Sequence, residues 1–336
     1  MSQNKKALIL VNTGTPDKPT VPAVRRYLFQ FLNDKRIIDI PWLWRKLLVN
    51  LIIVPFRAPK STKLYQQLWT DQGSPLLFHL ENLSGKLDTL IGDEYDVHGA
   101  MRYGNPSFKK ILKSLKNKPY DEISVLPLFP QYATSTTESI ADIINSELPK
   151  WTKQPKMHFV RQFYNHPAFV QAFTKRIESH NPEQYDHIVF SFHGLPLRQV
   201  DKMHPGIKSE TCPCVEDLPV HGQYCYKATC YDTTRRLAKQ LKLKPEQYTT
   251  SFQSRLSKNW LEPFTDETLI SLAREGKKKI LITAPSFVAD CLETSVELGI
   301  EYNHLFKQNG GERLTMVESL NDSDDWARAL VSIIRD

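Results

Sequence analysis

The sequence lacks low-complexity tracts, a recognisable leader and any long uninterrupted apolar run. Its 336 residues are 40% hydrophobic and 24% charged, which is the composition of an ordinary globular protein with a large core. The first residues, Met-Ser-Gln-Asn-Lys-Lys, lead straight into a strand-like run, so we expect no secretory signal peptide. These absences argue against fibrous, secreted and membrane-spanning proteins and predict a cytoplasmic one.

Cysteine is scarce, with only five residues, and in a cytoplasmic chain these are expected to be thiols or metal ligands, because disulfides are rare there. Four of them crowd together in the pattern C-x-C-x₁₀-C-x₄-C, formed by Cys212, Cys214, Cys225 and Cys230. Structural zinc prefers C-x₂₋₄-C pairs, for which C-x-C is tight. The spacing leaves an iron–sulfur cluster, a zinc ion and no metal as alternatives.

A dinucleotide fingerprint is also missing, because residues 12–16 (Asn-Thr-Gly-Thr-Pro) contain one glycine where that motif needs three. Acidic excess is absent too: the net charge is +7 and the pI is near 9.0. Such charge suits nucleic acid or an anionic surface. No helix-turn-helix or basic-aromatic RNA motif occurs, so no nucleic-acid partner is expected.

The anionic-surface hypothesis rests on residues 41–60, which combine aromatic and aliphatic side chains with flanking cations. The apolar part is shorter than the ~20 residues of a spanning helix. Asn50, Pro55 and the Arg45-Lys46 pair argue further against insertion. The composition fits a segment that dips into a membrane surface, with a buried core helix as the alternative.

Strand-like runs alternate with amphipathic stretches along the whole chain, which predicts an α/β fold with doubly wound parallel sheets. We expect two Rossmann-like domains with four-stranded parallel sheets flanked by helices and a cleft between them. The boundary is placed at a polar, Pro-containing stretch, giving domains 1–152 and 153–336. The expected strands are residues 7–11, 95–101, 123–128, 158–160, 188–192, 248–252, 280–283 and 314–317.

Two segments place titratable groups just past buried strands, where open α/β sheets bind ligands. One is Ser-Phe-His-Gly-Leu-Pro at residues 191–196, and the other covers residues 290–302. On an α-helix, acids at spacings of three, four and four share one face and repel one another unless a cation or proton is shared. Those acids are Asp290, Glu293, Glu297 and Glu301.

These segments resemble the two signature blocks of the ferrochelatase family, enzymes that insert ferrous iron into a porphyrin. Further blocks appear in the family's order, so the resemblance spans nearly the whole chain. They include residues 10–16 (Leu-Val-Asn-Thr-Gly-Thr-Pro), 101–103 (Met-Arg-Tyr), 126–137 and 252–267. The resemblance implies insertion of Fe²⁺ into protoporphyrin IX to give protoheme, the terminal step of heme synthesis. It also implies that the last helix, 322–334, returns to the first domain.

Metal insertion removes two pyrrole protons and delivers a divalent cation to the ring. Within the resemblance, His193 is the expected catalytic base, because imidazole titrates near neutral pH. Glu293 is expected opposite it, where the two would share the iron or a proton, and Glu297 and Glu301 would extend an iron or proton track. Asp290 would orient the site. Cys291 departs from the family pattern, which has histidine there; either that histidine is dispensable, which we favour, or Cys291 contributes a soft metal ligand.

The resemblance also implies a porphyrin site with apolar walls and a polar rim. Candidate walls and contacts are Arg102, Tyr103, Phe129, Tyr132, Ser135, Thr136, Phe252 and Trp260. A shorter stretch before Trp260 than the family usually has predicts that Trp260 is displaced. Core packing is the competing interpretation for each of these residues.

Some ferrochelatases hold a [2Fe–2S] cluster, a subset of them through an internal cysteine insertion, and this resemblance favours the cluster for Cys212, Cys214, Cys225 and Cys230. Residues 41–60 correspond to a hydrophobic lip, which implies peripheral contact with the inner face of the membrane. Alternative functions are a chelatase for coproporphyrin or another tetrapyrrole and a non-catalytic porphyrin- or heme-binding protein. The coexistence of His193 with the acids favours catalysis.

Overall fold

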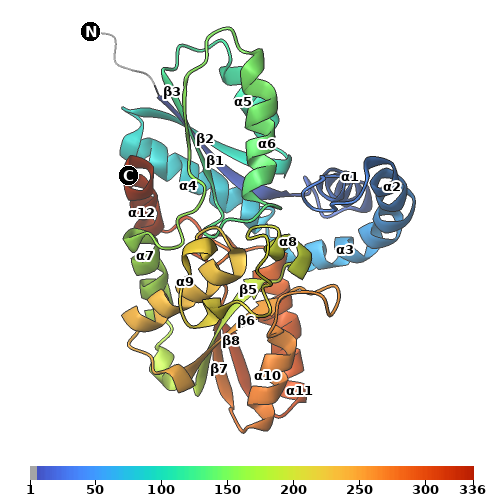
Figure 1. Cartoon of the computed structure of the whole chain (residues 1–336), viewed down its shortest axis with the longest axis vertical. Coiled ribbons are helices and arrows are strands. Elements are labelled where there is room, and N and C mark those ends of the chain that lie inside the picture. The colour runs from blue at the N-terminus through green and yellow to red at the C-terminus, as the bar shows by residue number, and fades with distance from the viewer. Residues whose placement is uncertain (1–5) are drawn as a thin grey trace. The chain divides into compact units, whose positions relative to one another are not determined.

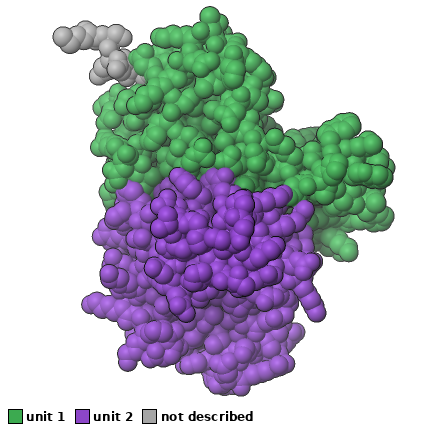
Figure 2. Space-filling view, viewed as in Figure 1, with its two compact units in different colours: residues 1–129, 134–161, 322–336 green, residues 130–133, 162–321 purple. Residues whose placement is uncertain are grey.

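The computed structural model describes residues 6–336. We predicted from residues 1–6 that the chain has no signal peptide. Residues 1–5 lie outside the described part. The chain forms two compact units, coloured separately in Figure 2. Unit 1 contains residues 1–129, 134–161 and 322–336, and unit 2 contains residues 130–133 and 162–321.

Unit 1 is built on a parallel sheet of four strands in the order β2-β1-β3-β4. The strands are β1 (Lys6–Thr15), β2 (Tyr95–Gly104), β3 (Glu122–Pro127) and β4 (Lys156–Phe159). Residues 7–11 in β1 are fully buried. A central parallel strand is covered on both faces and therefore reads as a continuous apolar run.

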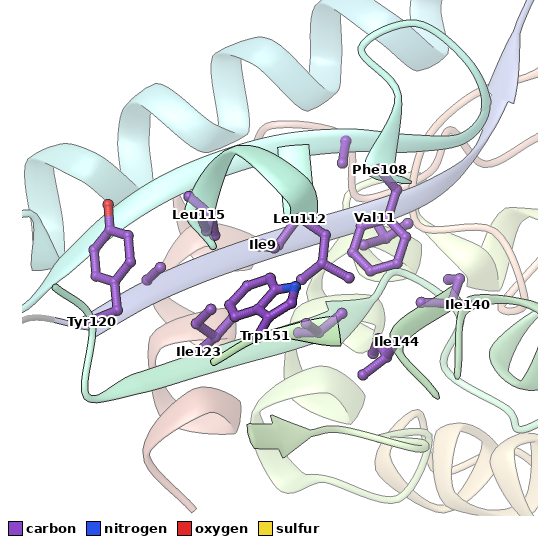
Figure 3. Close-up of a cluster of buried hydrophobic side chains, with 13 residues drawn as sticks. Ile9, Val11, Phe108, Leu112, Leu115, Tyr120, Ile123, Ile140, Ile144 and Trp151 are labelled. Carbon is purple, nitrogen blue, oxygen red and sulfur yellow. The ribbon is translucent and has the colours of Figure 1, made fainter. Parts of the chain in front are cut away.

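Helices flank the sheet of unit 1 (Figure 1). On one face, α5 (Phe108–Leu115) and α6 (Thr137–Glu147) pack against the strands, and Figure 3 shows this core around Trp151. The helix α4 (Pro75–Ile91) packs against β1 and β2, and it also contacts α12 (Asp324–Arg335). The end of the chain thus belongs to unit 1.

Unit 2 repeats the pattern, with a parallel sheet in the order β6-β5-β7-β8. The strands are β5 (His187–His193), β6 (Tyr248–Gln253), β7 (Lys279–Thr283) and β8 (Arg313–Met316). Leu269, Ile280, Leu298 and Phe306 belong to a buried core cluster that joins this sheet to α10 (Thr265–Arg274), to a helix at Leu292–Glu301 labelled η7, and to α11 (Tyr302–Gln308). The other helices of unit 2 are α7 (Pro167–Glu178), α8 (Leu197–Asp201) and α9 (Tyr226–Gln240).

Every predicted strand run coincides with one of these strands, and the predicted class of two Rossmann-like units with parallel four-stranded sheets is confirmed. One helix differs from the predicted α-helix. Leu292–Glu301 is a π-helix, in which the Tyr302 N–H donates to the Glu297 carbonyl five residues earlier. The α-helical spacing assumed for the acids therefore does not apply to it.

The predicted membrane-surface segment forms one helical run made of α2 (Trp42–Leu47), the π-helical η1 (Leu48–Ile53) and α3 (Val54–Leu68), which follows α1 (Val21–Leu32). Many of its exposed side chains are large and apolar, namely Trp42, Leu43, Trp44, Leu47, Leu51, Ile52 and Phe56. Arg45 is buried and donates to the carbonyls of Ile38 and Ile40, so it does not supply the surface charge assigned to it. None of the helices in residues 6–336 is both long enough and apolar enough to span a bilayer.

Candidate functional site

The carboxyl ends of β5 and β7 are the natural ligand site of unit 2. The chain runs from β5 to β6 on one side and then returns to place β7 on the other side of β5. The strand order reverses at this point, and open α/β sheets bind their ligands outside the carboxyl ends of the strands at such a point. His193 is the last residue of β5, and residues 284–291 follow β7.

The His193 ring is oriented by its own turn. Its Nδ1 lies 2.6 Å from the Gly194 carbonyl oxygen. Because a carbonyl oxygen only accepts, Nδ1 carries the proton in the neutral ring, and Nε2 keeps a free lone pair. The ring lies between Trp260 and Phe287, with centroids 6.4 and 6.2 Å away. His193 is thus presented as a base through Nε2.

Gly194 is required by close packing at this turn. Its N–H donates to the Gln253 carbonyl at 2.8 Å, which ties the turn to the end of β6. A Cβ at position 194 would lie 2.8 Å from that oxygen and 3.3 Å from the Trp260 ring. Trp260 therefore packs beside His193, and the shorter preceding stretch does not carry it away from this turn.

The π-helix η7 starts after Cys291, whose N–H donates to Thr294 Oγ1 at 3.0 Å. Asp290 lies ahead of this helix. Its carboxylate accepts hydrogen bonds from the Ser319 N–H at 3.0 Å, from Asn321 Nδ2 at 2.8 Å and from Thr294 Oγ1 at 3.1 Å. The expectation that Asp290 shares a helix face with the three glutamates is wrong, because these bonds hold it against the loop after β8.

The Glu297 carboxylate is held by three hydrogen bonds. It accepts from the Ser254 N–H at 2.9 Å, from Ser254 Oγ at 2.5 Å and from the Tyr302 hydroxyl at 3.0 Å. Burial raises the pKa of Glu297, and the neighbouring Glu293 charge raises it further, whereas the Ser254 bond and His193 lower it. The charges of Glu293 and His193 thus both act on Glu297, in opposite directions.

Glu293 is half-buried and lies beside Cys291. Burial raises the pKa of the Cys291 thiol well above its ordinary value, and the charge of Glu293 and a hydrogen bond to it raise it further. Cys291 is thus a neutral neighbour of Glu293. Glu301, at the end of η7, is exposed. Glu297 is thus the glutamate that interacts with His193, Glu293 is its half-buried neighbour, and Glu301 faces solvent.

No group of three or more His, Cys, Asp or Glu side chains within residues 6–336 is placed so that it could hold a metal ion. This holds both for the acids near His193 and for the cysteines between residues 212 and 230.

Arg102 and Tyr103, two of the predicted porphyrin contacts, are bonded to other side chains of unit 1. Arg102 forms an ion pair with Asp34 and donates to Ser139 Oγ at 2.7 Å. The Tyr103 hydroxyl lies 2.8 Å from Asp34, and burial raises the pKa of Tyr103 far above its ordinary value. Asp34 lies in no recognisable motif, so its place in this network could not be predicted from the sequence. A pocket of about 370 Å³ opens beside this network, lined by Gln30, Asn33, Asp34, Lys35, Arg45, Arg102, Asp142 and Ile143.

The other predicted contacts divide between core and half-buried positions. Phe252 is only 1% exposed and packs on Phe192 and Tyr231, so core packing accounts for it. Tyr132 is buried against Tyr224. Phe129 is half-buried and packs on the core of unit 1, and Ser135 and Thr136 are half-buried just before α6.

The four cysteines of the insertion are free and buried (this group, Cys212, Cys214, Cys225 and Cys230, is called the four-cysteine site below). Burial raises the pKa of Cys214 to about 12, and hydrogen bonding and charge couple it to Cys212 and Cys225. Burial raises the pKa of Cys230 well above its ordinary value, and the charges of Cys225 and Cys214 raise it further. The thiols are neighbours, but within residues 6–336 they are not placed as a group that could hold a metal ion.

Two histidines and a lysine surround the four-cysteine site. His204 Nε2 lies 3.3 Å from Cys225 Sγ, and His221 Nε2 lies 3.3 Å from Cys212 Sγ. The buried ammonium of Lys227 donates to the Ser209 carbonyl at 2.6 Å, and its charge lowers the pKa of Cys214 and Cys225. These contacts were missed from sequence, although both histidines and the lysine lie in or beside the cysteine pattern.

The chain matches known proteins over its whole length. A family model described as Ferrochelatase matches residues 5–336. A ferrochelatase of Legionella pneumophila (strain Lens) is 41% identical over 334 residues, which cover 99% of each chain. A ferrochelatase of Coxiella burnetii (strain Dugway 5J108-111) is 40% identical over 339 residues, covering 99% of this chain and 94% of the relative.

Solved structures add a likeness of fold. SirB from Bacillus subtilis with Fe³⁺ superposes with a TM-score of 0.57 at 12% identity, covering 98% of this chain and 94% of that one. DR2241 from Deinococcus radiodurans, a multi-domain protein described as structurally similar to chelatases, gives a TM-score of 0.52 at 10% identity over 98% of this chain and 55% of that one. The family model and the close relatives go further than fold: this chain belongs to the ferrochelatase family, enzymes that insert ferrous iron into a porphyrin.

Proposed function

We propose that the chain inserts Fe²⁺ into protoporphyrin IX to give protoheme, with His193 and Glu293 as its catalytic residues. The observation that carries these roles is the His193 ring itself, whose Nδ1 is committed to the Gly194 carbonyl and whose Nε2 keeps a lone pair. Nε2 takes a pyrrole proton, and the Glu297 carboxylate, which interacts electrostatically with His193, stabilises the resulting imidazolium.

The glutamates are proposed to serve iron delivery and proton removal. Carboxylate oxygens bind Fe²⁺ and release it more readily than thiolates do. The raised pKa of Glu297 lets this group take up a proton closer to neutral pH than an ordinary carboxyl does. Glu301, exposed at the end of η7, would exchange iron or protons with solvent. Asp290 is proposed to set the start of η7 through its three hydrogen bonds.

The porphyrin is proposed to lie against Trp260, beside His193. An anaerobic assay with purified protein, Fe²⁺ and either protoporphyrin IX or coproporphyrin tests the substrate. Faster turnover of protoporphyrin IX is expected. Preference for coproporphyrin contradicts the substrate proposal, and absence of turnover with both indicates a binding protein.

The four-cysteine site is proposed to hold a [2Fe–2S] cluster. Burial raises the pKa of Cys214, Cys225 and Cys230, and the charges of neighbouring cysteines raise it further, which metal ligation would relieve by binding the sulfurs as thiolates. The buried Lys227 ammonium forms no ion pair within the described residues, and an anionic cluster would supply the missing negative charge. A two-iron cluster also separates its thiolates more widely than a single tetrahedral ion does.

The cluster predicts a coloured protein. Anaerobically purified chain should be reddish-brown, with about two irons and two acid-labile sulfides per chain. Cys225→Ser and Cys230→Ser should bleach the colour and lower the soluble yield together, because the loop around them would lose ligation. Cys291→Ser is the matched control and should keep the colour, since Cys291 lies beside Glu293. A colourless protein with one zinc per chain contradicts this proposal.

Residues 41–60 are proposed to contact the inner face of the membrane peripherally. The exposed side chains Trp44, Leu51 and Phe56 are 65, 66 and 73% accessible, and Lys46 and Lys60 can meet anionic headgroups. The triple change Trp44→Ser, Leu51→Ser and Phe56→Ser should release the protein from vesicles containing anionic lipid in a flotation assay. Leu90→Ser, an exposed leucine of α4, is the control. Equal flotation of the wild-type protein, the triple variant and Leu90→Ser contradicts the proposed membrane contact.

A further inference from the structure

Ser254, the first residue after β6, has a backbone conformation that residues with a side chain rarely adopt. Its φ is +63°, in the left-handed region, which glycine enters freely and other residues enter under strain. Such strain persists only where the surrounding structure holds it, and it gathers at functional sites. In this conformation both the N–H and the hydroxyl of Ser254 donate to one carboxylate, that of Glu297.

The residues on either side of Ser254 are anchored. Gln253 is buried, and its carbonyl accepts the Gly194 N–H at 2.8 Å. The side chain of Gln253 donates from Nε2 to the Glu293 carbonyl at 3.0 Å, which ties the end of β6 to η7. Arg255 forms ion pairs with two carboxylates at the start of α10, with N–O distances of 2.7 and 2.8 Å. These contacts hold Ser254 in its left-handed conformation.

The hydrogen bonds to Glu297 occupy its two oxygens unequally. Oε1 accepts both the Ser254 N–H, at 2.9 Å, and the Tyr302 hydroxyl, at 3.0 Å. Oε2 accepts only one of these bonds, from Ser254 Oγ at 2.5 Å. An ionised carboxylate has about four acceptor sites, two on each oxygen. The described residues thus leave Glu297 one open acceptor site, and it is on Oε2.

We propose that Ser254 is a positioning residue that presents Glu297 to an incoming proton or cation through Oε2 alone. This inference rests on the proposed part of Glu297 in iron delivery and proton removal, and it adds the residue that orients this acid. A carboxylate free to rotate must be ordered when the proton or cation arrives, and that ordering adds to the barrier. One that is held by both oxygens is oriented beforehand.

The test compares Ser254→Ala with Ser254→Gly in the full chain, using anaerobic insertion of Fe²⁺ into the preferred porphyrin. Both changes remove the hydroxyl and keep the backbone N–H. Each should lower kcat by a factor of about 2 to 10, the equivalent of one net hydrogen bond, with little change in the KM for porphyrin. The melting temperature of Ser254→Gly should lie above that of Ser254→Ala, because only alanine is strained at a positive φ. A purely structural role would instead make kcat follow the melting temperature.

A double-mutant cycle with Glu297→Gln shows whether Ser254 acts through Glu297. Addition of Ser254→Ala to Glu297→Gln should lower kcat by less than about twofold, because the carboxylate that Ser254 orients is already gone. Ser257→Ala is the matched control. Ser257 is exposed in the loop after β6, and its Oγ accepts the Asn259 N–H at 3.3 Å. This variant should keep the wild-type kcat.

Recovery of kcat in Ser254→Gly along with the melting temperature overturns the inference, as does an undiminished effect of Ser254→Ala in the Glu297→Gln background. Wild-type kcat in both Ser254 variants, together with a slow Glu297→Gln protein, overturns it while leaving the proposed role of Glu297 standing. Wild-type kcat in Glu297→Gln rejects that role itself, and the orientation by Ser254 then has no function to serve.

Discussion

His193→Ala should lower kcat for iron insertion by about a hundredfold or more, the usual contribution of a general base. The Nδ1 proton is held by the Gly194 carbonyl, so the lost group is the Nε2 lone pair that accepts a pyrrole proton. Porphyrin binding, followed by fluorescence quenching, should persist because Trp260 and Phe287 remain. Stopped-flow insertion at saturating Fe²⁺ separates the two effects.

His304→Ala is the matched control for this experiment. His304 is an exposed histidine of α11 in the same unit, and its removal should leave kcat within about twofold, as expected for a surface change away from the reacting groups. A His193→Ala protein that kept more than a tenth of wild-type turnover would be incompatible with the role of His193 as base.

The sheet architecture could be predicted because its determinants are local. β5 and β7 are buried on both faces, so their apolar runs stand out, and the alternation of such runs with amphipathic stretches leaves few topologies. The predicted location of the site follows from the same rule, since His193 ends β5 and Asp290 follows β7, and these neighbouring parallel strands end at one edge of the sheet.

The details of the site depend on contacts between residues distant in sequence. Asp290 is held by Ser319 and Asn321, which no local pattern connects with it. The helix that follows has a π-helical hydrogen-bond pattern, whereas the 3–4–4 spacing of its acids presumes an α-helix. Similarly, the charge of Arg45 fits a membrane surface in sequence, yet two backbone carbonyls bind it in the interior.

Glu293→Gln should lower kcat by about a hundredfold, while Glu301→Gln should lower it by no more than about threefold. Both changes keep the shape of the side chain and remove one charge. Glu293 acts electrostatically on Glu297, which itself feels His193, whereas Glu301 is exposed at the far end of η7. Both substitutions make the same chemical change. A difference between their kcat losses therefore reports where each glutamate lies relative to the reaction centre.

The pH dependence of insertion gives Glu293→Gln a second signature. The Glu293 charge raises the pKa of Glu297, so its removal should move that pKa down toward the ordinary carboxyl value, although burial still keeps it raised. If ionised Glu297 accepts protons during insertion, the acidic limb of the residual kcat profile should shift to lower pH. Glu301→Gln should leave this limb in place, because Glu301 is exposed at the far end of η7 and is not among the main influences on the pKa of Glu297. A larger loss in Glu301→Gln than in Glu293→Gln would place the reaction centre at the exposed end of η7 and would reject the pairing of His193 with Glu293.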